Sequence, residues 1–387
     1  MNPSRPNHGL SDILSMLLLN EQQTLFLRAC LWSGEEGCRA WLNWCETVSD
    51  TRDMLRQKEF GVKGLTPLLY HNLQQNEVAI NSSLLTFFRT AQIYEEKRTK
   101  VFREICQKVL AELTRAKKRF LVVKGSPLAD TAFENPSLRH CHDLDIVLED
   151  PEPREILALI ASLDFTLLTR NISSEWENLT LVHQDGLLVS LHRKFFGISL
   201  YNRGQKEMWA RCEGKLVADV PCQVLSPADA LLHVCGQAFA SGHSILPTWV
   251  SDSWAIIVRF PDLNWEQLIA CARQSHLALP MFVMLGYLAE KLQAPIPSQV
   301  LVDLGKAASK SIIGQEIALS IARKFRNGGL KGLLGKTKNW QSRLPILKWM
   351  MLPSLGYIRW TNPHTVAWAL PLLYVSRPVK YLARRFQ

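Results

Sequence analysis

The stretch KGSPLADTAFENPSLRHCHDLDIVLED, from Lys124 to Asp150, decides the fold of this protein. It starts at the end of the β-branched run RFLVVKG (119–125), which is typical of a buried strand that enters a tight turn. Directly behind the turn, Ser126 suits the N-cap of a helix and Pro127 suits the first helical position. The beginning of the stretch therefore predicts a strand, a Gly-Ser turn and a helix.

The end of the same stretch, HDLDIVLED (142–150), predicts a second strand. Side chains alternate along a strand, so Asp143 and Asp145 share one face and the apolar residues share the other. Two carboxylates this close repel each other unless water solvates them or a cation lies between them. Mg²⁺ takes one or two protein carboxylates together with phosphate oxygens, and such ions promote phosphoryl displacement. We therefore predict that Asp143 and Asp145 bind Mg²⁺ (or Mn²⁺).

The Gly-Ser turn is the candidate phosphate site. A glycine at a strand-to-helix turn lets the backbone approach a phosphate, and the free N–H groups favour an anion. We expect Gly125 and Ser126 to cradle the phosphates of a nucleoside triphosphate (NTP), with Lys124 and Arg139 neutralising further charge. A lone Gly-Ser or a lone Asp-x-Asp is usually an ordinary surface feature, so the prediction depends on their order along the chain.

The rest of the chain places this unit between two helical regions. Apolar residues recur at intervals of three and four from about residue 10 to 117, and again from Ser226 to about residue 322. Between them we expect strands near residues 120, 145, 166, 180 and 190, the last two joined by an Asp185-Gly186 hairpin turn. This pattern predicts an α+β fold with a small mixed β-sheet. The predicted regions are an N-terminal helical region (1–95), an α/β core (96–200), a C-terminal helical region (201–322) and a basic tail (323–387).

Composition limits the class of protein. The 387 residues are 47% hydrophobic and 21% charged, as in a globular protein with more than one packed unit. The nine cysteines form no C-x-x-C pair and are scattered through apolar segments, which favours reduced thiols inside a cell. No apolar segment near the start is long enough for export or for crossing a bilayer. We therefore expect a cytoplasmic protein.

The net charge of +10 is concentrated in the tail. After Glu316 the sequence holds thirteen Lys and Arg residues and no acid. We consider three interpretations, namely short helices packed on the body, contact with an anionic membrane surface as a peripheral protein, and, less favoured, binding of nucleic acid. The apolar run TVAWALPLLYV (365–375) is too short to span a membrane. The tail also carries four tryptophans, Trp340, Trp349, Trp360 and Trp368.

The segment LVVKGSPLADTAFENPSLRHCHDLDIVL (121–148) resembles the pattern LKG…LA…Y…P…R…DIDLLV of an uncharacterised bacterial nucleotidyltransferase family. That family is part of the DNA polymerase β-type nucleotidyltransferase superfamily. The strand LVSLHRKF (188–195) and a helical segment with Trp249 and Asp252 extend the likeness to about residue 300. The resemblance implies metal-dependent transfer of a nucleotidyl group from an NTP to an acceptor hydroxyl. A small molecule, a peptide or a protein would be the acceptor.

The sequence departs from the superfamily pattern at one site residue. The superfamily generally uses a third carboxylate on a later strand, and Ser190 stands at that place, two residues before His192. His192 shares a strand face with Ser190 and is our candidate for a catalytic base or metal ligand. Glu175, Glu177 and Asp185 are alternative sources of the missing acid. The alternative function is therefore a catalytically impaired nucleotide-binding or interaction protein of the same fold.

Three further histidines need a separate interpretation. His140, Cys141 and His142 are adjacent, so they cannot all face one ion, and no second ligand pair lies at zinc-finger spacing. We therefore do not expect zinc here. His233 lies in an apolar helical segment, where a packed histidine is the commoner role.

Overall fold

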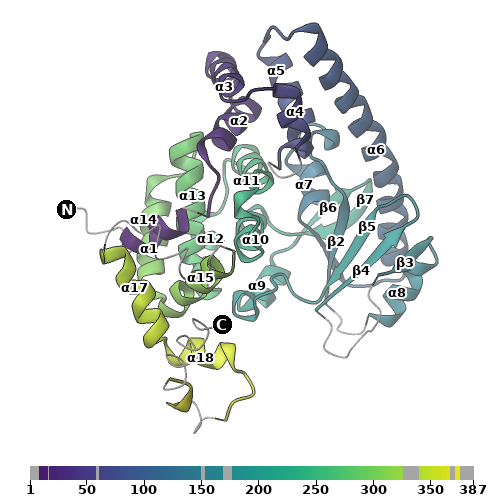
Figure 1. The fold of residues 1–387 in the computed structure, drawn as a ribbon. Helices are drawn as coiled ribbons and strands as arrows, with labels where there is room; N and C mark the ends of the chain where they lie inside the picture. Colours follow the sequence, from purple (N-terminus) through teal and green to yellow (C-terminus); the bar gives the residue numbers. More distant parts are fainter. Residues whose placement is uncertain are drawn as a thin grey trace, which may run out of the picture.

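A computed structural model describes most of the chain, and the fold is α+β, as the sequence predicts (Figure 1). A mixed sheet lies at the centre of the sequence, with helices before and after it. The described residues are 8–15, 17–57, 61–149, 153–168, 177–325, 340–366 and 371–374.

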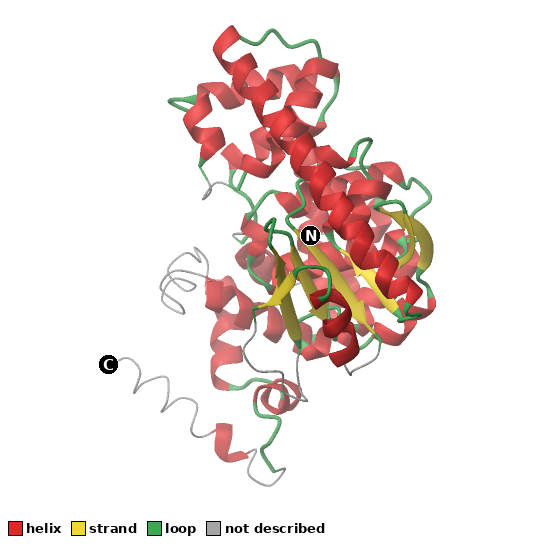
Figure 2. Cartoon of the chain, turned by 90° about the vertical axis from the view of Figure 1, so that its right-hand side faces the viewer, coloured by secondary structure: helices red, strands yellow, loops and turns green. Residues whose placement is uncertain are grey.

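The N-terminal region is helical, as expected, and ends in the 34-residue helix α6. Asn81 caps α6, because its side chain accepts a hydrogen bond from the Leu84 backbone N–H at 2.9 Å. α6 runs without a break through the boundary predicted at residue 95 and lies across one face of the sheet (Figure 2). The helices are α1 (His8–Ser15), α2 (Glu21–Leu31), α3 (Gly34–Glu46), α4 (Thr51–Arg56), α5 (Thr66–Gln75) and α6 (Ser82–Arg115).

The sheet contains all five predicted strands. Its order is β3-β4-β5-β2-β1-β7-β6, with β2 antiparallel to β1 and parallel to β5. The predicted Asp185-Gly186 turn joins β4 to β5, and Gly186 has a positive φ of 85° that suits glycine. The strands are β1 (Phe120–Val123), β2 (Asp143–Leu148), β3 (Phe165–Leu167), β4 (Asn178–His183), β5 (Leu188–His192), β6 (Glu213–Val217) and β7 (Val220–Val224).

The hairpin of β6 and β7 was not predicted, and it lies inside the region expected to be helical. Its two turn residues, Ala218 and Asp219, have positive φ values of 47° and 65°. Such a turn usually carries Asn-Gly or Asp-Gly, so Ala-Asp gave no hairpin signal in the sequence. Because β7 pairs with β1, the hairpin extends the sheet beyond the strand that leads to the Gly-Ser turn.

One helix precedes the hairpin, others follow it as far as Phe325, and described helices resume at Trp340. Ser226 caps α10 as predicted, since its hydroxyl accepts a hydrogen bond from the Asp229 backbone N–H at 3.3 Å. These helices are α9 (Gln205–Ala210), α10 (Pro227–Ala240), α11 (Thr248–Arg259), α12 (Trp265–Gln274), α13 (Ala278–Leu292), α14 (Ser298–Lys310), α15 (Ile312–Phe325), α17 (Trp340–Met351) and α18 (Leu355–Thr361); α8 (Arg154–Ala161) precedes β3 and α7 (Gly125–Thr131) follows β1.

The sheet is covered on both faces. On one face, Leu144 and Ile146 of β2 pack with residues of α6 and α8. On the other face, Val147 of β2 belongs to the larger core of the surrounding helices. The face of β2 that carries Asp143 and Asp145 therefore meets helices, and Asp145 is only 2% exposed.

Two further observations concern the cysteines and the length and polarity of the helices. The nine cysteines, all of which lie among the described residues, are free thiols. In the described part of the chain, no helix has both the length and the apolar character needed to cross a bilayer.

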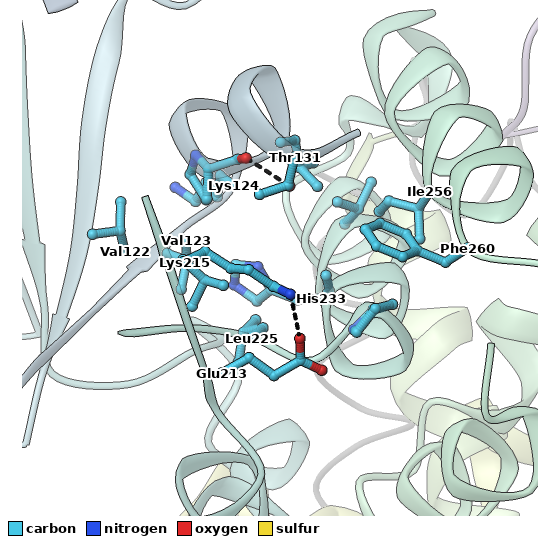
Figure 3. A pocket seen from close by; sticks show the side chains of 16 residues that line it. Val122, Val123, Lys124, Thr131, Glu213, Lys215, Leu225, His233, Ile256 and Phe260 are labelled. Carbon is cyan, nitrogen blue, oxygen red and sulfur yellow. Dashed lines mark hydrogen bonds and ion pairs between the residues drawn. The ribbon is translucent and has the colours of Figure 1, made fainter. Parts of the chain in front are cut away.

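His233 of α10 is a packed helix residue, as expected. It lies at a small apolar cavity between Val122 and Val123 of β1, Ile256 of α11 and Phe260 directly after that helix (Figure 3). Its Nε2 lies 3.0 Å from the backbone carbonyl oxygen of Phe195. Burial is the main reason why the pKa of His233 falls to about 3, with the charge of Lys124 acting in the same direction.

This low pKa makes His233 a source of acid instability. Between pH 6.5 and about pH 3 the unfolded chain binds a proton at residue 233 that the folded chain does not bind. We expect stability to fall as pH falls through this range, with His233 contributing up to about 1.4 kcal/mol per pH unit. Urea denaturation at several pH values should show a shallower dependence for His233→Gln. The exposed residue His364 supplies the control His364→Gln, and equal slopes for His233→Gln and the unmodified protein would contradict the prediction.

Candidate functional site

Five of the predicted site residues meet at a cleft of about 410 Å³ between the sheet and the helices α10 and α11, whereas Ser126 and His192 are not among its lining residues. β1 and the following turn supply Lys124 and Gly125, and β2 supplies Asp143 and Asp145. The facing wall comes from the helical region, which contributes these polar or aromatic side chains: Gln237 of α10, Ser241 directly after it, and Thr248, Trp249, Ser251 and Asp252 of α11. The cleft therefore joins the central sheet to a region some hundred residues later in the chain.

Asp145 is a buried carboxylate with two close polar partners. Lys124 Nζ donates to Asp145 Oδ1 at 2.6 Å, and His192 Nε2 lies 2.6 Å from the same oxygen. Burial acts to raise the pKa of Asp145, but the hydrogen bond with His192 and the charge of Lys124 outweigh it and lower that pKa to about 2. Asp145 is therefore a fixed negative charge at the floor of the cleft.

Asp143 differs from Asp145 in environment. Burial and the neighbouring charge of Asp145 raise the pKa of Asp143 above its usual value. The ring of His142 is close, with its Nε2 3.9 Å from Asp143 Oδ2. Two carboxylates of one strand face thus repel each other in this cleft, and a divalent cation would relieve that repulsion.

Asp143 and Asp145 offer Mg²⁺ the pair of carboxylates that it accepts from a protein. Phosphate and water would supply the remaining ligands. Asp143 and Asp145 both line the cleft. In the described part of the chain, no three His, Cys, Asp or Glu side chains gather around one point as ligands. The protein alone therefore offers an open, two-carboxylate site.

Lys124 has an unusual backbone conformation for a residue with a side chain. Its φ is +62° and its ψ is −129°, in a region that costs about 1–3 kcal/mol for a residue other than glycine. This conformation starts α7 at Gly125, so the sequence-based prediction of Ser126 as N-cap was wrong by two residues. It also directs the chain so that Lys124 Nζ reaches Asp145.

Arg139 is held by a buried ion pair. Its Nε donates to Asp252 Oδ1 at 3.0 Å and its Nη2 donates to Oδ2 at 2.8 Å, a bidentate contact between the core and α11. Both side chains line the cleft and are largely buried, at 12% and 6% exposure. The guanidinium that we expected to contact phosphate is thus already paired with a carboxylate.

Gly125 and Ser126 differ in their contacts and in the pockets that they line. A Cβ at Gly125 would lie 2.6 Å from Arg139 Nη1, so glycine is required here for the close approach of the guanidinium. The Ser126 hydroxyl donates to the backbone carbonyl oxygen of Asp143 at 3.2 Å. Ser126 lines a separate small pocket towards α6, together with Arg103 and Asp130.

The structure places two of the three candidates for the missing acid, Glu177 and Asp185, away from the cleft. Ser190 pairs with Asp145 across β5 and β2 and is 9% exposed, so a serine stands beside Asp145 on the neighbouring strand. Glu177 is 68% exposed beside Lys194, and Asp185 is 55% exposed in the hairpin turn. Neither lines the cleft. Glu175 lies outside the described residues.

Sequence reasoning missed a cluster around His140. His140 lines the cleft, and its Nδ1 lies 2.9 Å from Oε2 of Glu95, a carboxylate of α6 that is only 5% exposed. Arg98 of the same helix pairs with Glu95 and lies 3.0 Å from the same His140 nitrogen. Burial opposes the charge of Glu95, but the hydrogen bonds with His140 and Arg98 outweigh it and lower the pKa of Glu95. Nothing in the spacing of these residues indicates the contact, because 45 positions separate Glu95 from His140.

The three adjacent residues considered for zinc do not form a site. The His140 and His142 rings stack with centroids 6.0 Å apart, whereas Cys141 contacts the Arg139 guanidinium at 3.6 Å. Burial raises the pKa of the Cys141 thiol to about 11, which disfavours the thiolate that zinc requires.

Comparison with known proteins identifies one family. The model of a family described as "Uncharacterised nucleotidyltransferase" matches residues 59–293, more than half of the chain. The matched range contains β1, β2, β5 and the helices α10 and α11, and thus both walls of the cleft. No curated protein matches the chain.

The contact of Arg139 with Gly125 predicts a specific sensitivity. Gly125→Ala should lower the free energy of unfolding by about 1–3 kcal/mol, because Arg139 is held by Asp252 and cannot move aside freely. Gly286→Ala in α13 is the control, since a Cβ there meets nothing within 4 Å and alanine favours a helix. Urea denaturation measures both. Equal free energies of unfolding for the two variants would contradict the prediction, because they would show that the Arg139 guanidinium moves aside for the added methyl group.

Proposed function

Because the chain belongs to the uncharacterised nucleotidyltransferase family, we propose that it moves a nucleoside monophosphate from an NTP such as ATP to an acceptor hydroxyl. A bond forms between the acceptor oxygen and the α-phosphorus, and the bond to the bridging oxygen breaks. Pyrophosphate leaves with that electron pair, and the hydroxyl proton passes to a base. The observation that carries the proposal is the carboxylate pair Asp143 and Asp145 facing Lys124 and Gly125 in one cleft.

Asp143 and Asp145 would hold the metal ion. When bound, Mg²⁺ supplies positive charge to the phosphate oxygens on which charge develops. Asp145 is prepared for this role because its pKa of about 2 keeps it ionised at neutral pH. Lys124 and His192 hold Asp145 through a single oxygen, Oδ1, and so set the direction in which its carboxylate faces.

The turn after β1 would receive the triphosphate. Gly125 brings backbone to the cleft, and Lys124 Nζ lies at the carboxylate pair, where it would neutralise phosphate charge. Arg139 keeps the wall of the cleft in place through Asp252, and its charge adds to the field there. The Ser126 hydroxyl supports the site through its hydrogen bond to the Asp143 backbone rather than from inside the cleft.

His140 is our candidate for the base that accepts the proton. We propose that Nδ1 carries a proton and donates it to Glu95, which would leave the lone pair on Nε2; 37% of the His140 side chain is exposed at the cleft. Glu95 would be a positioning residue that fixes this tautomer. His192, which the sequence suggested as base or ligand, contacts Asp145 and is absent from the described lining of the cleft, so we propose a positioning role for it.

The metal site can be tested by removing its charges. Asp143→Asn combined with Asp145→Asn should reduce binding of Mg²⁺-ATP at least about tenfold and abolish transfer of label from α-labelled ATP to a cell extract that supplies acceptors. Calorimetric titration and radiolabel transfer measure the two effects. Asp185→Asn removes a similar charge from the exposed hairpin and should leave both unchanged. Unaltered affinity in the double variant would remove the basis of the proposal.

The role of His140 predicts a separation of binding from turnover. His140→Gln should slow transfer by a factor of about 10²–10⁴, the usual contribution of a general base, with little effect on Mg²⁺-ATP affinity. Glu95→Gln should also slow transfer, but by a smaller factor than His140→Gln. Loss of ATP binding in step with turnover would instead indicate a structural role for this cluster.

A second candidate function is nucleotide binding without turnover. Ser190 in place of the acid opposite Asp145 favours it, as does the occupation of Asp145 Oδ1 by Lys124. Binding of Mg²⁺-ATP in the calorimeter with no label transfer to any extract would select this function. The protein would then act as a nucleotide-dependent interaction protein of the same fold.

A further inference from the structure

The corner between α17 and α18 has two apolar faces. One faces the body of the protein, where Ile346, Trp349, Tyr357 and Ile358 are buried, at 0%, 2%, 4% and 1% exposure. α17 packs against α1, and α18 packs against α15. The corner is therefore part of the folded body, as one interpretation of the basic tail expected.

A buried acid anchors this corner. Glu316 of α15, the last acid of the sequence, accepts hydrogen bonds from the Ser354 backbone N–H at 2.6 Å and from the Ser354 hydroxyl. Ser354 in turn caps α18. Glu316 is 6% exposed, so its carboxylate lies inside the protein, where it binds Ser354. It is therefore not one of the groups on the surface of the corner, where the positive side chains lie.

The second apolar face is exposed. On α17, Leu344 and Met351 are 57% and 48% exposed, and Leu352 and Leu355 just beyond that helix are 67% and 55% exposed. Positions 344, 348, 351 and 352 follow helical spacing, so they lie on one side of the helix, opposite Ile346 and Trp349. Among the described residues, α17 therefore has one buried and one exposed apolar side.

Positive charge is interleaved with these apolar side chains. Lys348 lies within the exposed stripe of α17, and Arg359 is exposed on α18. We call this surface the basic apolar corner; it comprises Leu344, Lys348, Met351, Leu352, Leu355 and Arg359. The sequence around it, from residue 317 to 387, contains no acid at all.

We propose that the basic apolar corner docks on the surface of an anionic lipid bilayer. Leucine and methionine side chains would enter the boundary between headgroups and acyl chains, while the lysine and arginine would contact lipid phosphates. Apolar burial and charge attraction act together at such a surface, and neither suffices alone. The proposal is independent of nucleotidyl transfer.

The two tail tryptophans whose side chains the structure describes favour lipid over nucleic acid as the partner. A protein that binds single-stranded RNA presents aromatic rings on which bases stack. Here Trp349 is buried, with the Arg323 guanidinium 5.9 Å from its ring, and Trp360 packs edge-on against Tyr357. What the corner does expose is aliphatic, which suits acyl chains and not bases. Trp368 lies outside the described residues.

Vesicle binding tests the proposal with the full-length chain. Co-sedimentation should show binding to vesicles of phosphatidylcholine with phosphatidylserine and little binding to phosphatidylcholine alone. Leu352→Glu combined with Leu355→Glu should weaken binding at least about tenfold, because each leucine contributes apolar burial worth about that factor. Lys348→Gln with Arg359→Gln should weaken it about fivefold per charge and reduce its salt dependence.

Matched controls separate the corner from general surface hydrophobicity. Leu42→Glu and Leu216→Glu alter leucines that are 58% and 59% exposed on α3 and β6, and these variants should bind vesicles as the unmodified protein does. Thermal unfolding would verify that every variant is folded. The proposal is wrong if anionic vesicles are not bound, if neutral vesicles are bound equally well, or if the corner variants bind like the controls. Retention of a single-stranded RNA oligonucleotide without vesicle binding would select nucleic acid instead.

Discussion

The buried charge of Asp145 is the constraint on which the site depends. A carboxylate that is 2% exposed persists as an anion only when cations or hydrogen-bond donors compensate its lost hydration. Lys124 and His192 do so through one oxygen, and each comes from a different strand beside β2. The mixed sheet is what places β1 and β5 on either side of β2. The strained backbone of Lys124 is tolerated because this ammonium has to reach a buried partner.

A second buried ion pair, between Arg139 and Asp252, holds the two walls of the cleft together. The Arg139–Asp252 contact joins the segment before β2 to α11, and so fixes the distance between the sheet and the helical wall. The same guanidinium lies against Gly125, which gives the glycine of the turn a packing role in addition to any contact with phosphate. Cleft shape and stability are thus coupled at one arginine, and an anion that competed for its guanidinium would weaken the attachment of α11.

The sequence-based prediction was most accurate where the signal was local. The five strands, the hairpin at Gly186 and the cap at Ser226 follow from alternation, turn residues and capping preferences within a few positions. The hairpin at Ala218 and Asp219 was missed because its turn residues are not those that usually adopt positive φ. The carboxylate pair was recognised, but its burial was not, because the covering helices follow β2 by about 80 residues or more.

The sequence by itself determined the order of strand, turn, helix and strand with two aspartates on one face, because each of these features arises between neighbouring residues. Only the tertiary structure decided which groups meet the aspartates. It brought His192 to Asp145 across 47 positions, Glu95 to His140 across 45, and Arg139 to Asp252 across 113. Such pairs are selected by the need of buried charges for partners, and that need leaves no periodicity or spacing in the chain.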